Sequence, residues 1–234
     1  MLTIGEYMST CAVLFAKKPE PGKVKTRLQS ELGPEAAARL YRAFLLDCAT
    51  ELAASQAATK VIAYAPADAA GAMRDLLAEV GEFAYAAQPE TDLGGRMEAL
   101  VQWGFAAGND RVVLLGSDSP SLPAAYIDRA LELLREREVV LGPSTDGGYY
   151  LVGRRVGASR IFSDVAWSTG AVLAQTLERL EGQSLGLLPP WYDVDTPAEA
   201  GWLKVHLQAI VRAGGGMGRH SLEVMRDMAL PLPS

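Results

Sequence analysis

One stretch of the chain, residues 111–123 with the sequence RVVLLGSDSPSLP, constrains its fold more than any other. It begins with the apolar run 112–115, which is typical of a strand that is covered on both faces in a parallel sheet. Gly116 ends the run, and Asp118 follows between two serines. In open α/β sheets, ligands bind at the carboxyl ends of the strands. The stretch therefore predicts an α/β protein, and we hypothesise that Asp118 holds a divalent metal against nucleotide phosphates. An Asx turn or a helix cap would use the same residue types.

Apolar patterning along the rest of the chain alternates between strands and helices. Strands are predicted over 10–16, 60–64, 82–86, 112–115, 138–142, 149–152 and 185–188. Helices are predicted over 35–52, 69–79, 96–107, 126–137 and 197–211, and another after Ser168–Gly170. This order predicts one three-layer α/β/α domain over 10–212, with a mostly parallel sheet and right-handed crossovers. Residues 213–234 contain the run Gly214–Gly216 near their start and predict a flexible tail, with a short helix over 222–230.

Composition restricts the classes of partner. The chain has 234 residues, a net charge of −6 and 49% hydrophobic residues, which is typical of an ordered globular protein. An acidic balance argues against binding to nucleic acid, which requires a basic face. No apolar run approaches the roughly 18 residues of a membrane span, and the first nine residues lack the features of a signal peptide. Cys11 and Cys48 lie in apolar segments and predict buried, reduced thiols. We expect a cytoplasmic protein.

The segment after the first predicted strand, residues 17–28 (KKPEPGKVKTRL), contains most of the positive charge near that edge of the sheet. Two prolines exclude a helix, and Gly22 permits a tight turn. The segment is either a solvated basic loop or a clamp in which cations and backbone N–H groups meet a polyphosphate. Its spacing matches neither a Walker loop nor a dinucleotide-binding fingerprint.

Three later segments each have a structural and a functional interpretation. Gly94–Arg96 is either a turn before a helix or a close backbone approach to a base or ribose, with Arg96 in reach of a phosphate. Asp146–Gly148 predicts a hairpin turn that also leaves space for an acceptor, with Asp146 as a polar contact. Ser168–Gly170 is predicted to cap the helix that follows it, and the amino end of that helix also suits an anionic acceptor.

The segment YDVDTP contains two further carboxylates. Asp195 or Thr196 is suited to cap the helix that begins at Pro197. Asp193 and Asp195 are two positions apart, so in an extended segment both point to the same side and suit a hard divalent cation. Capping requires only one of these residues.

Five motifs in order resemble one family. They are FAKKPEPGKVKTRL, Gln88 with DLGGRM, GSDSP, GPSTDGGYYLVG and YDVDTP, and together they cover about residues 11–207. The combination resembles the DUF2064 (selenodomain-associated or arsenosugar-biosynthesis) glycosyltransferase-like family, which is similar to the nucleotide-diphospho-sugar transferase (GT-A, Rossmann-like) superfamily. The first loop is also similar to that of 2-phospholactate guanylyltransferases.

The resemblance implies roles for particular residues. It implies catalytic roles for Lys25 and Asp146, and a metal site for Mg²⁺ or Mn²⁺ at Asp118 with Asp193 or Asp195. The implied nucleotide-binding residues are Phe15, Ala16, Lys17, Gly22, Lys25, Arg27, Gln88, Gly95 and Arg96. The implied acceptor-binding residues are Gly147, Gly148, Tyr149, Ser168 and Thr169.

The resemblance leaves the reaction open. GT-A glycosyltransferases commonly carry D-x-D where this chain has Ser117-Asp118-Ser119, so YDVD must supply the second carboxylate. We expect a metal-dependent transferase that uses a nucleotide-activated donor and a small acceptor. Family resemblance favours glycosyl transfer from a nucleotide sugar. The alternatives are nucleotidyl transfer from an NTP with release of pyrophosphate, and a non-catalytic nucleotide-binding protein.

Overall fold

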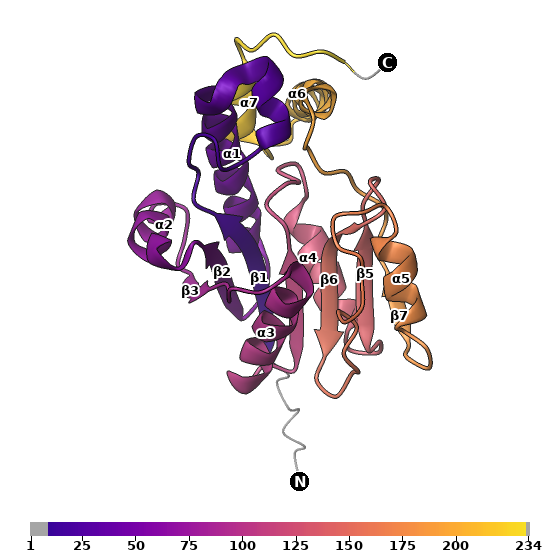
Figure 1. Cartoon of the computed structure of the whole chain (residues 1–234). Helices are drawn as coiled ribbons and strands as arrows, with labels where there is room; N and C mark the ends of the chain where they lie inside the picture. The colour runs from indigo at the N-terminus through magenta and orange to yellow at the C-terminus, as the bar shows by residue number, and fades with distance from the viewer. Residues whose placement is uncertain (1–8, 233–234) are drawn as a thin grey trace.

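The computed structural model describes residues 9–232, which form a seven-stranded sheet with helices on both faces (Figure 1). The strands are β1 (Thr10–Lys17), β2 (Thr59–Ala65), β3 (Ala84–Ala87), β4 (Arg111–Leu115), β5 (Val139–Pro143), β6 (Tyr149–Arg155) and β7 (Leu185–Leu187). The α-helices are α1 (Gln29–Ala54), α2 (Ala70–Leu77), α3 (Leu93–Ala106), α4 (Ala124–Leu133), α5 (Val172–Glu178), α6 (Pro197–Arg212) and α7 (Arg219–Met225). Two 3₁₀ helices, η1 (Thr26–Leu28) and η2 (Ala67–Ala69), complete the set.

The sheet has the order β3-β2-β1-β4-β6-β5-β7, and only β6 runs antiparallel to its neighbours. The β5–β6 pair is the hairpin that the Asp-Gly turn predicts. The carboxyl ends of β1, β4 and β5 therefore meet at one edge, as ligand sites in open α/β sheets require. The predicted mostly parallel sheet and α/β/α class are confirmed.

Alternate residues of each strand face opposite layers of helices. In β1, Ala12 and Leu14 pack with apolar side chains of α1, α2 and α4. Cys11 and Val13 point to the other face, where α3 and the segment 161–180 cover them. Both faces of β4 are buried, which explains the unbroken apolar run 112–115 within it. Cys11 and Cys48 are buried free thiols, as predicted.

Two helices begin earlier than their sequence patterns predict. α1 has a helical turn before Gly33, whose φ of 75° marks a kink ahead of the predicted segment. α3 begins at Leu93, so the glycine pair lies inside the helix and does not end regular structure. Asp92 caps this helix by accepting a hydrogen bond from the N–H of Gly95 at 2.7 Å. A Cβ on Gly94 would lie 2.5 Å from the carbonyl oxygen of Phe162. Close packing between segments therefore explains the absent side chain.

The described part of the tail is packed against the domain, which corrects the prediction of a flexible segment. α7 spans 219–225, in place of the predicted 222–230, and Met225 is fully buried among residues of α1 and α6. The buried carboxylate of Asp47 in α1 accepts hydrogen bonds from the backbone N–H groups of His220 (3.0 Å) and Ser221 (2.8 Å). These contacts join positions more than 170 residues apart, so local composition contains no sign of them.

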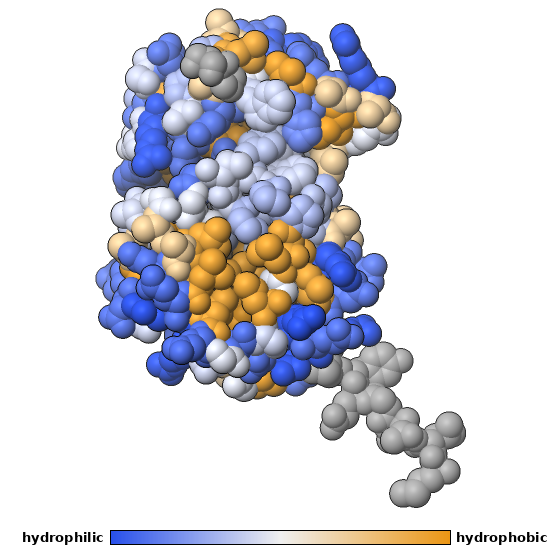
Figure 2. All heavy atoms as spheres, turned by 90° about the vertical axis from the view of Figure 1, so that its right-hand side faces the viewer, coloured by the Kyte–Doolittle hydropathy of each residue, from blue (hydrophilic) through white to orange (hydrophobic). Residues whose placement is uncertain are grey.

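β7 is a three-residue edge strand, and Leu187 on it is 62% exposed. Figure 2, which views the molecule from the side of α5 and β7, shows apolar atoms gathered at this end. Within residues 9–232, no helix is long and apolar enough to cross a membrane.

Candidate functional site

A cavity of about 800 Å³ lies at the carboxyl edge of the sheet, between the loops after β1, β4 and β5 and the segment YDVD. Fifteen of the predicted site residues line it: Phe15, Ala16, Lys17, Lys25, Arg27, Gln88, Arg96, Asp118, Asp146, Gly148, Tyr149, Ser168, Thr169, Asp193 and Asp195. Gly22, Gly95 and Gly147 were also predicted, and they lie outside its lining. Segments that are far apart in sequence therefore meet at the edge that the sequence predicts.

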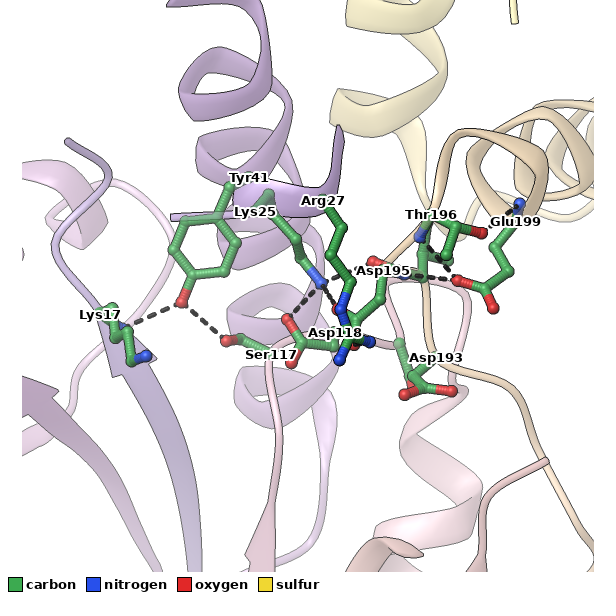
Figure 3. Close-up of polar contacts among 12 residues, drawn as sticks. Lys17, Lys25, Arg27, Tyr41, Ser117, Asp118, Asp193, Asp195, Thr196 and Glu199 are labelled. Carbon is green, nitrogen blue, oxygen red and sulfur yellow. Dashed lines mark hydrogen bonds and ion pairs between the residues drawn. The ribbon is translucent and has the colours of Figure 1, made fainter. Parts of the chain in front are cut away.

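The ammonium group of Lys25 lies between two carboxylates at the centre of this edge (Figure 3). Its Nζ is 2.7 Å from Oδ1 of Asp118 and 2.7 Å from Oδ1 of Asp195. It also donates a hydrogen bond to the carbonyl oxygen of Val194 at 2.5 Å. The Lys25 side chain is 4% exposed, whereas the two carboxylates remain open to the cavity. Burial lowers the pKa of this ammonium, but the two carboxylates outweigh burial and raise the pKa above its ordinary value.

The backbone conformation of Lys25 is unusual and places its side chain inward. Lys25 has φ 46° and ψ 47°, a left-handed conformation that costs a non-glycine residue on the order of 1–3 kcal/mol. It is the N-cap of η1, where its carbonyl accepts a hydrogen bond from the N–H of Leu28 at 3.0 Å. Val24 anchors the loop by packing against Tyr41. Strain of this kind persists where surrounding contacts hold it, and it is common at functional sites.

The loop after β4 and the YDVD segment are joined by hydrogen bonds. The carbonyl of Asp118 accepts a hydrogen bond from the N–H of Val194 at 2.9 Å, and Ser119 Oγ donates to the carbonyl of Tyr192 at 2.9 Å. A capping box holds the start of α6. Thr196 is its N-cap, and Glu199 Oε2 accepts hydrogen bonds from the N–H groups of Asp195 and Thr196, each at 2.7 Å. Capping therefore uses Thr196, and the Asp195 carboxylate remains available to Lys25.

Asp193 and Asp195 have different protein partners in this structure, although both line the cavity. Ser144 Oγ donates a hydrogen bond to Asp193 Oδ1 at 3.0 Å, and the Asp193 carboxylate points away from Lys25 (Figure 3). Burial raises the pKa of Asp193, and the neighbouring carboxylate of Asp146 raises it further. Asp195 thus contacts Lys25 whereas Asp193 contacts Ser144, and a divalent cation shared by the two aspartates stays a prediction.

The pair Asp118 and Asp195 suits a magnesium or manganese ion. Both carboxylates already converge on one positive charge, that of Lys25. Within the described residues, no three His, Cys, Asp or Glu side chains are grouped so as to hold a metal. Mg²⁺ is commonly bound through one or two carboxylates together with substrate phosphates, and does not need an all-protein cage. The donor set therefore fits a metal whose remaining ligands are phosphate oxygens and water.

Tyr41 and Ser117 join the site although sequence reasoning did not select them. The buried hydroxyl of Tyr41 accepts a hydrogen bond from the N–H of Lys17 at 2.9 Å and bonds Ser117 Oγ at 2.9 Å (Figure 3). Burial, assisted by the charge of Asp118, raises the pKa of Tyr41 to about 12, so the phenol stays protonated. Tyr41 occupies an apolar position of α1, and a tyrosine there indicates only core packing in the sequence.

Backbone packing shapes the predicted acceptor region. Asp146 Oδ1 accepts a hydrogen bond from the N–H of Gly148 at 2.9 Å, which closes the hairpin turn. Gly147 has φ 91°, and a Cβ there would overlap the carbonyl of Gly170. Ser168 and Thr169 line the cavity but do not cap α5, whose N-cap is Ala171. The prediction that they form this cap is wrong, because the helix begins later, at Val172.

Comparisons with known proteins identify relatives of this chain. The DUF2064 family model, described as "Uncharacterized protein conserved in bacteria", matches residues 47–169, more than half of the chain. The chain is 27% identical to the 2-phospho-L-lactate guanylyltransferase of Methanothermobacter thermautotrophicus, over 94% of this chain and 92% of that protein.

Solved structures share the architecture. A candidate nucleotide-diphospho-sugar transferase of Desulfovibrio desulfuricans G20 is 35% identical, with a TM-score of 0.83, over 94% of this chain and 95% of that one. A nucleotidyl transferase of Methanothermobacter thermautotrophicus is 14% identical with a TM-score of 0.57, over 88% of this chain and 99% of that one, and supports the fold alone. The expectation that the chain is a transferase is confirmed. With its family model, motifs and fold in agreement, the chain belongs to the DUF2064 family and has the nucleotide-diphospho-sugar transferase fold.

Proposed function

We propose that this protein transfers a nucleotidyl group from a nucleoside triphosphate to a small acceptor and releases pyrophosphate. The buried ammonium of Lys25 between Asp118 and Asp195 is the observation that carries the proposal. Catalysis of phosphoryl-type transfer depends mainly on positioning and on charge stabilisation. A fixed cation at the cavity edge supplies charge stabilisation, and it does not have to reorganise during the reaction.

Other cations that line the cavity are suited to the same role, the stabilisation of phosphate charge. Lys17 and Arg96 line it, and among the described residues neither forms an ion pair with a carboxylate. Arg27 lies at the mouth with its side chain 71% exposed and 3.6 Å from Asp195. Guanidinium and ammonium groups that face a cavity are the usual ligands of polyphosphate oxygens. This arrangement suits a triphosphate that approaches from the loop after β1.

The reaction would proceed by direct displacement. An acceptor oxygen attacks the α-phosphorus and forms the new P–O bond, while the bond from that phosphorus to the bridging oxygen breaks and pyrophosphate leaves. Lys25 offsets the charge that develops on the phosphates. Where the acceptor is a hydroxyl, Asp146 orients it and Asp193, whose pKa is raised by burial, can receive its proton. A Mg²⁺ or Mn²⁺ ion held by Asp118 and Asp195 would supply Lewis-acid stabilisation of the phosphate oxygens.

Glycosyl transfer is the second candidate, and two observations rank it below nucleotidyl transfer. The 27% identical relative, which the chain matches over nearly its whole length, is named for guanylyl transfer. The loop after β4 carries a single carboxylate, Asp118, and not the D-x-D that GT-A glycosyltransferases commonly use. The 35% identical structure is named as a candidate nucleotide-diphospho-sugar transferase, and that name supports glycosyl transfer from a nucleotide sugar. A non-catalytic nucleotide-binding protein would bind the same donors without turnover.

The test combines thermal shift with product detection. We expect GTP, CTP, UTP or ATP to raise the melting temperature with Mg²⁺ or Mn²⁺ and not with EDTA, since a ligand at 100 times its Kd adds about 2.7 kcal/mol. The stabilising NTP is then mixed with phosphorylated acids, sugar phosphates and polyols, and pyrophosphate is measured. Asp118→Asn should abolish the metal-dependent shift, whereas Asp75→Asn, at an exposed position of α2, should leave it unchanged.

The possible results separate the candidates. A shift with nucleotide sugars and with no triphosphate would contradict nucleotidyl transfer and support glycosyl transfer. Binding without turnover across the acceptor panel would favour the non-catalytic alternative. A metal-dependent shift that persists in Asp118→Asn would contradict the assigned metal ligand.

A further inference from the structure

Gln88 is a buried polar side chain whose orientation is fixed by the sheet. It follows β3 at the cavity edge and is 8% exposed. Its Nε2 donates hydrogen bonds to the carbonyl oxygens of Ala16 in β1 at 3.1 Å and Ala63 in β2 at 2.7 Å. Backbone carbonyls only accept, so the group that faces them must be the NH₂ end of the amide. The orientation of this amide is therefore determined by its partners.

The amide oxygen of Gln88 is consequently left as a fixed acceptor. Both N–H donors of the amide point into the strand ends, and Gln88 lines the cavity. In the part of the chain that the structure describes, no N–H or O–H donates to Oε1 of this residue. An acceptor whose lone pairs lack protein partners is satisfied by water or by a ligand. In a nucleotide cavity, the complementary ligand group is a hydrogen-bond donor, either an N–H of the base or a hydroxyl of the ribose.

Apolar side chains line the same cavity as this acceptor. Phe15 packs with Met97 in one cluster, and Leu93, one helical turn before Met97, is 40% exposed where it lines the same cavity. Flat apolar surfaces of this kind suit the faces of a base. The phosphate-binding cations lie further along, from Lys17 to Arg27. A nucleotide placed with its phosphates at Lys25 has its base directed toward α3 and the end of β3.

We infer that Gln88 reads the base of the donor and selects guanine, its Oε1 accepting hydrogen bonds from N1–H and the N2 amino group. These two donors are adjacent on the Watson–Crick edge, and one carbonyl oxygen with two lone pairs can accept from both. Adenine and cytosine place a ring acceptor next to their amino group, and uracil places its single N–H between two carbonyls. A lone fixed acceptor therefore favours guanine. The inference rests on the proposed function only in requiring that the cavity bind a nucleotide.

Inosine triphosphate provides the sharpest test, because it differs from GTP only by the absent N2 amino group. With wild-type protein and Mg²⁺, calorimetry should give a Kd for ITP about tenfold weaker than for GTP, the value of one hydrogen bond of about 1.4 kcal/mol. ATP, CTP and UTP should bind more weakly than ITP. Equal Kd values for GTP, ITP and ATP would overturn the inference and leave nucleotidyl transfer intact.

A variant series assigns the effect to the residue. Gln88→Met keeps the volume but can neither donate nor accept, so GTP and ITP should bind it within about twofold of each other. Gln102→Met, at an exposed position of α3 outside the cavity lining, should keep the GTP preference. Circular dichroism checks that Gln88→Met is folded, and if it is not, the wild-type GTP-to-ITP ratio decides alone. If GDP-sugars bind and triphosphates do not, the comparison of GDP with IDP tests Gln88 while the proposed reaction fails.

Discussion

The two halves of the cavity are built in different ways. On the side proposed to bind the donor, which comprises Lys25, Asp118, Asp195 and Tyr41 and is called the donor side, side chains hold one another: Lys25 contacts Asp118, Asp195 and the carbonyl of Val194, and Tyr41 links the ends of β1 and β4. On the side proposed to bind the acceptor, which comprises residues 146–149 and 168–170 and is called the acceptor side, backbone contacts hold the shape. There, among the described residues, the side chains of Asp146 and Thr169 bond only within their own turns: Asp146 accepts from the N–H of Gly148, and Thr169 donates to the carbonyl of Ala166 and accepts from the N–H of Ala171.

This difference indicates which part of the site is organised before substrate binds. A fixed network of charges lowers the reorganisation that charge stabilisation requires, and it suits a group such as a polyphosphate that every donor shares. Where backbone turns form the wall, the exposed side chains can be substituted while the shape of the backbone stays the same. We therefore expect the donor side to fail when a single polar side chain is removed, and the acceptor side to fail when a side chain is added.

Lys25→Met should cause the largest loss. Removing a preorganised charge at a reacting phosphate typically costs about 10²–10³-fold in turnover, and we expect at least 100-fold here. The free energy of unfolding should also fall, because Asp118 and Asp195 lose the cation between them. Lys18→Met is the matched control, since Lys18 pairs with Glu20 in the same loop but lies outside the cavity lining. Equal activity in the two variants would remove the basis of the comparison.

The stability loss in Lys25→Met has a defined pH dependence. The folded-state pKa of Lys25 is raised above its ordinary value of 10.5, so its contribution is complete below that pH and disappears as pH rises through the folded-state pKa. Denaturant unfolding should therefore give a constant difference between wild type and variant from pH 6 to 9, and a smaller one above about pH 10.5. A difference that grows with pH in this upper range would contradict the contact.

Gly147→Ala should damage the acceptor side selectively. The new Cβ would overlap the carbonyl of Gly170 and displace the wall beside it. Gly157→Ala is the matched control, because Gly157 has φ 86° against 91° for Gly147 and nothing within 4 Å of its Cβ position. Both changes carry a strain of about 1 kcal/mol or more from the positive φ. We expect only Gly147→Ala to raise the KM for the acceptor, at least tenfold, with the Kd of the donor nucleotide unchanged. Parallel effects in both variants would show that the contact with Gly170 is unimportant.

The sequence predicts the donor side well because its elements follow local rules. Apolar runs mark the strands, and the polar residues after them must reach the carboxyl edge of a parallel sheet, as Lys25 and Asp118 do. The partners within that edge depend on rotamers and on loops that meet only in the fold. The sequence therefore does not predict which of Asp193 and Asp195 joins Lys25, or that Tyr41 bonds the N–H of Lys17.

The errors in the sequence analysis have a common physical cause. Gly94 suggests a break in regular structure, yet it lies inside α3 because that helix packs closely on Phe162. The three glycines at 214–216 suggest a flexible tail, yet α7 behind them docks on α1 through Asp47. In each case a distant segment decides how the glycines are used. Local propensity contains no information about that segment.

Thr196→Ala should cause the smallest effect, and it tests whether the capping box or Lys25 holds Asp195 in place. Loss of an N-cap side chain typically costs about 1 kcal/mol, and the capping box here also orders the N–H of Asp195 through Glu199. We expect denaturant unfolding to show that loss, and the Kd for the donor nucleotide to weaken a few-fold, because Asp195 would be held less firmly. Thr196→Ser keeps the capping oxygen and should restore both values. If serine fails to restore donor binding, the position of Asp195 depends on Lys25 alone, and the donor side is held together by charge and not by the helix that follows it.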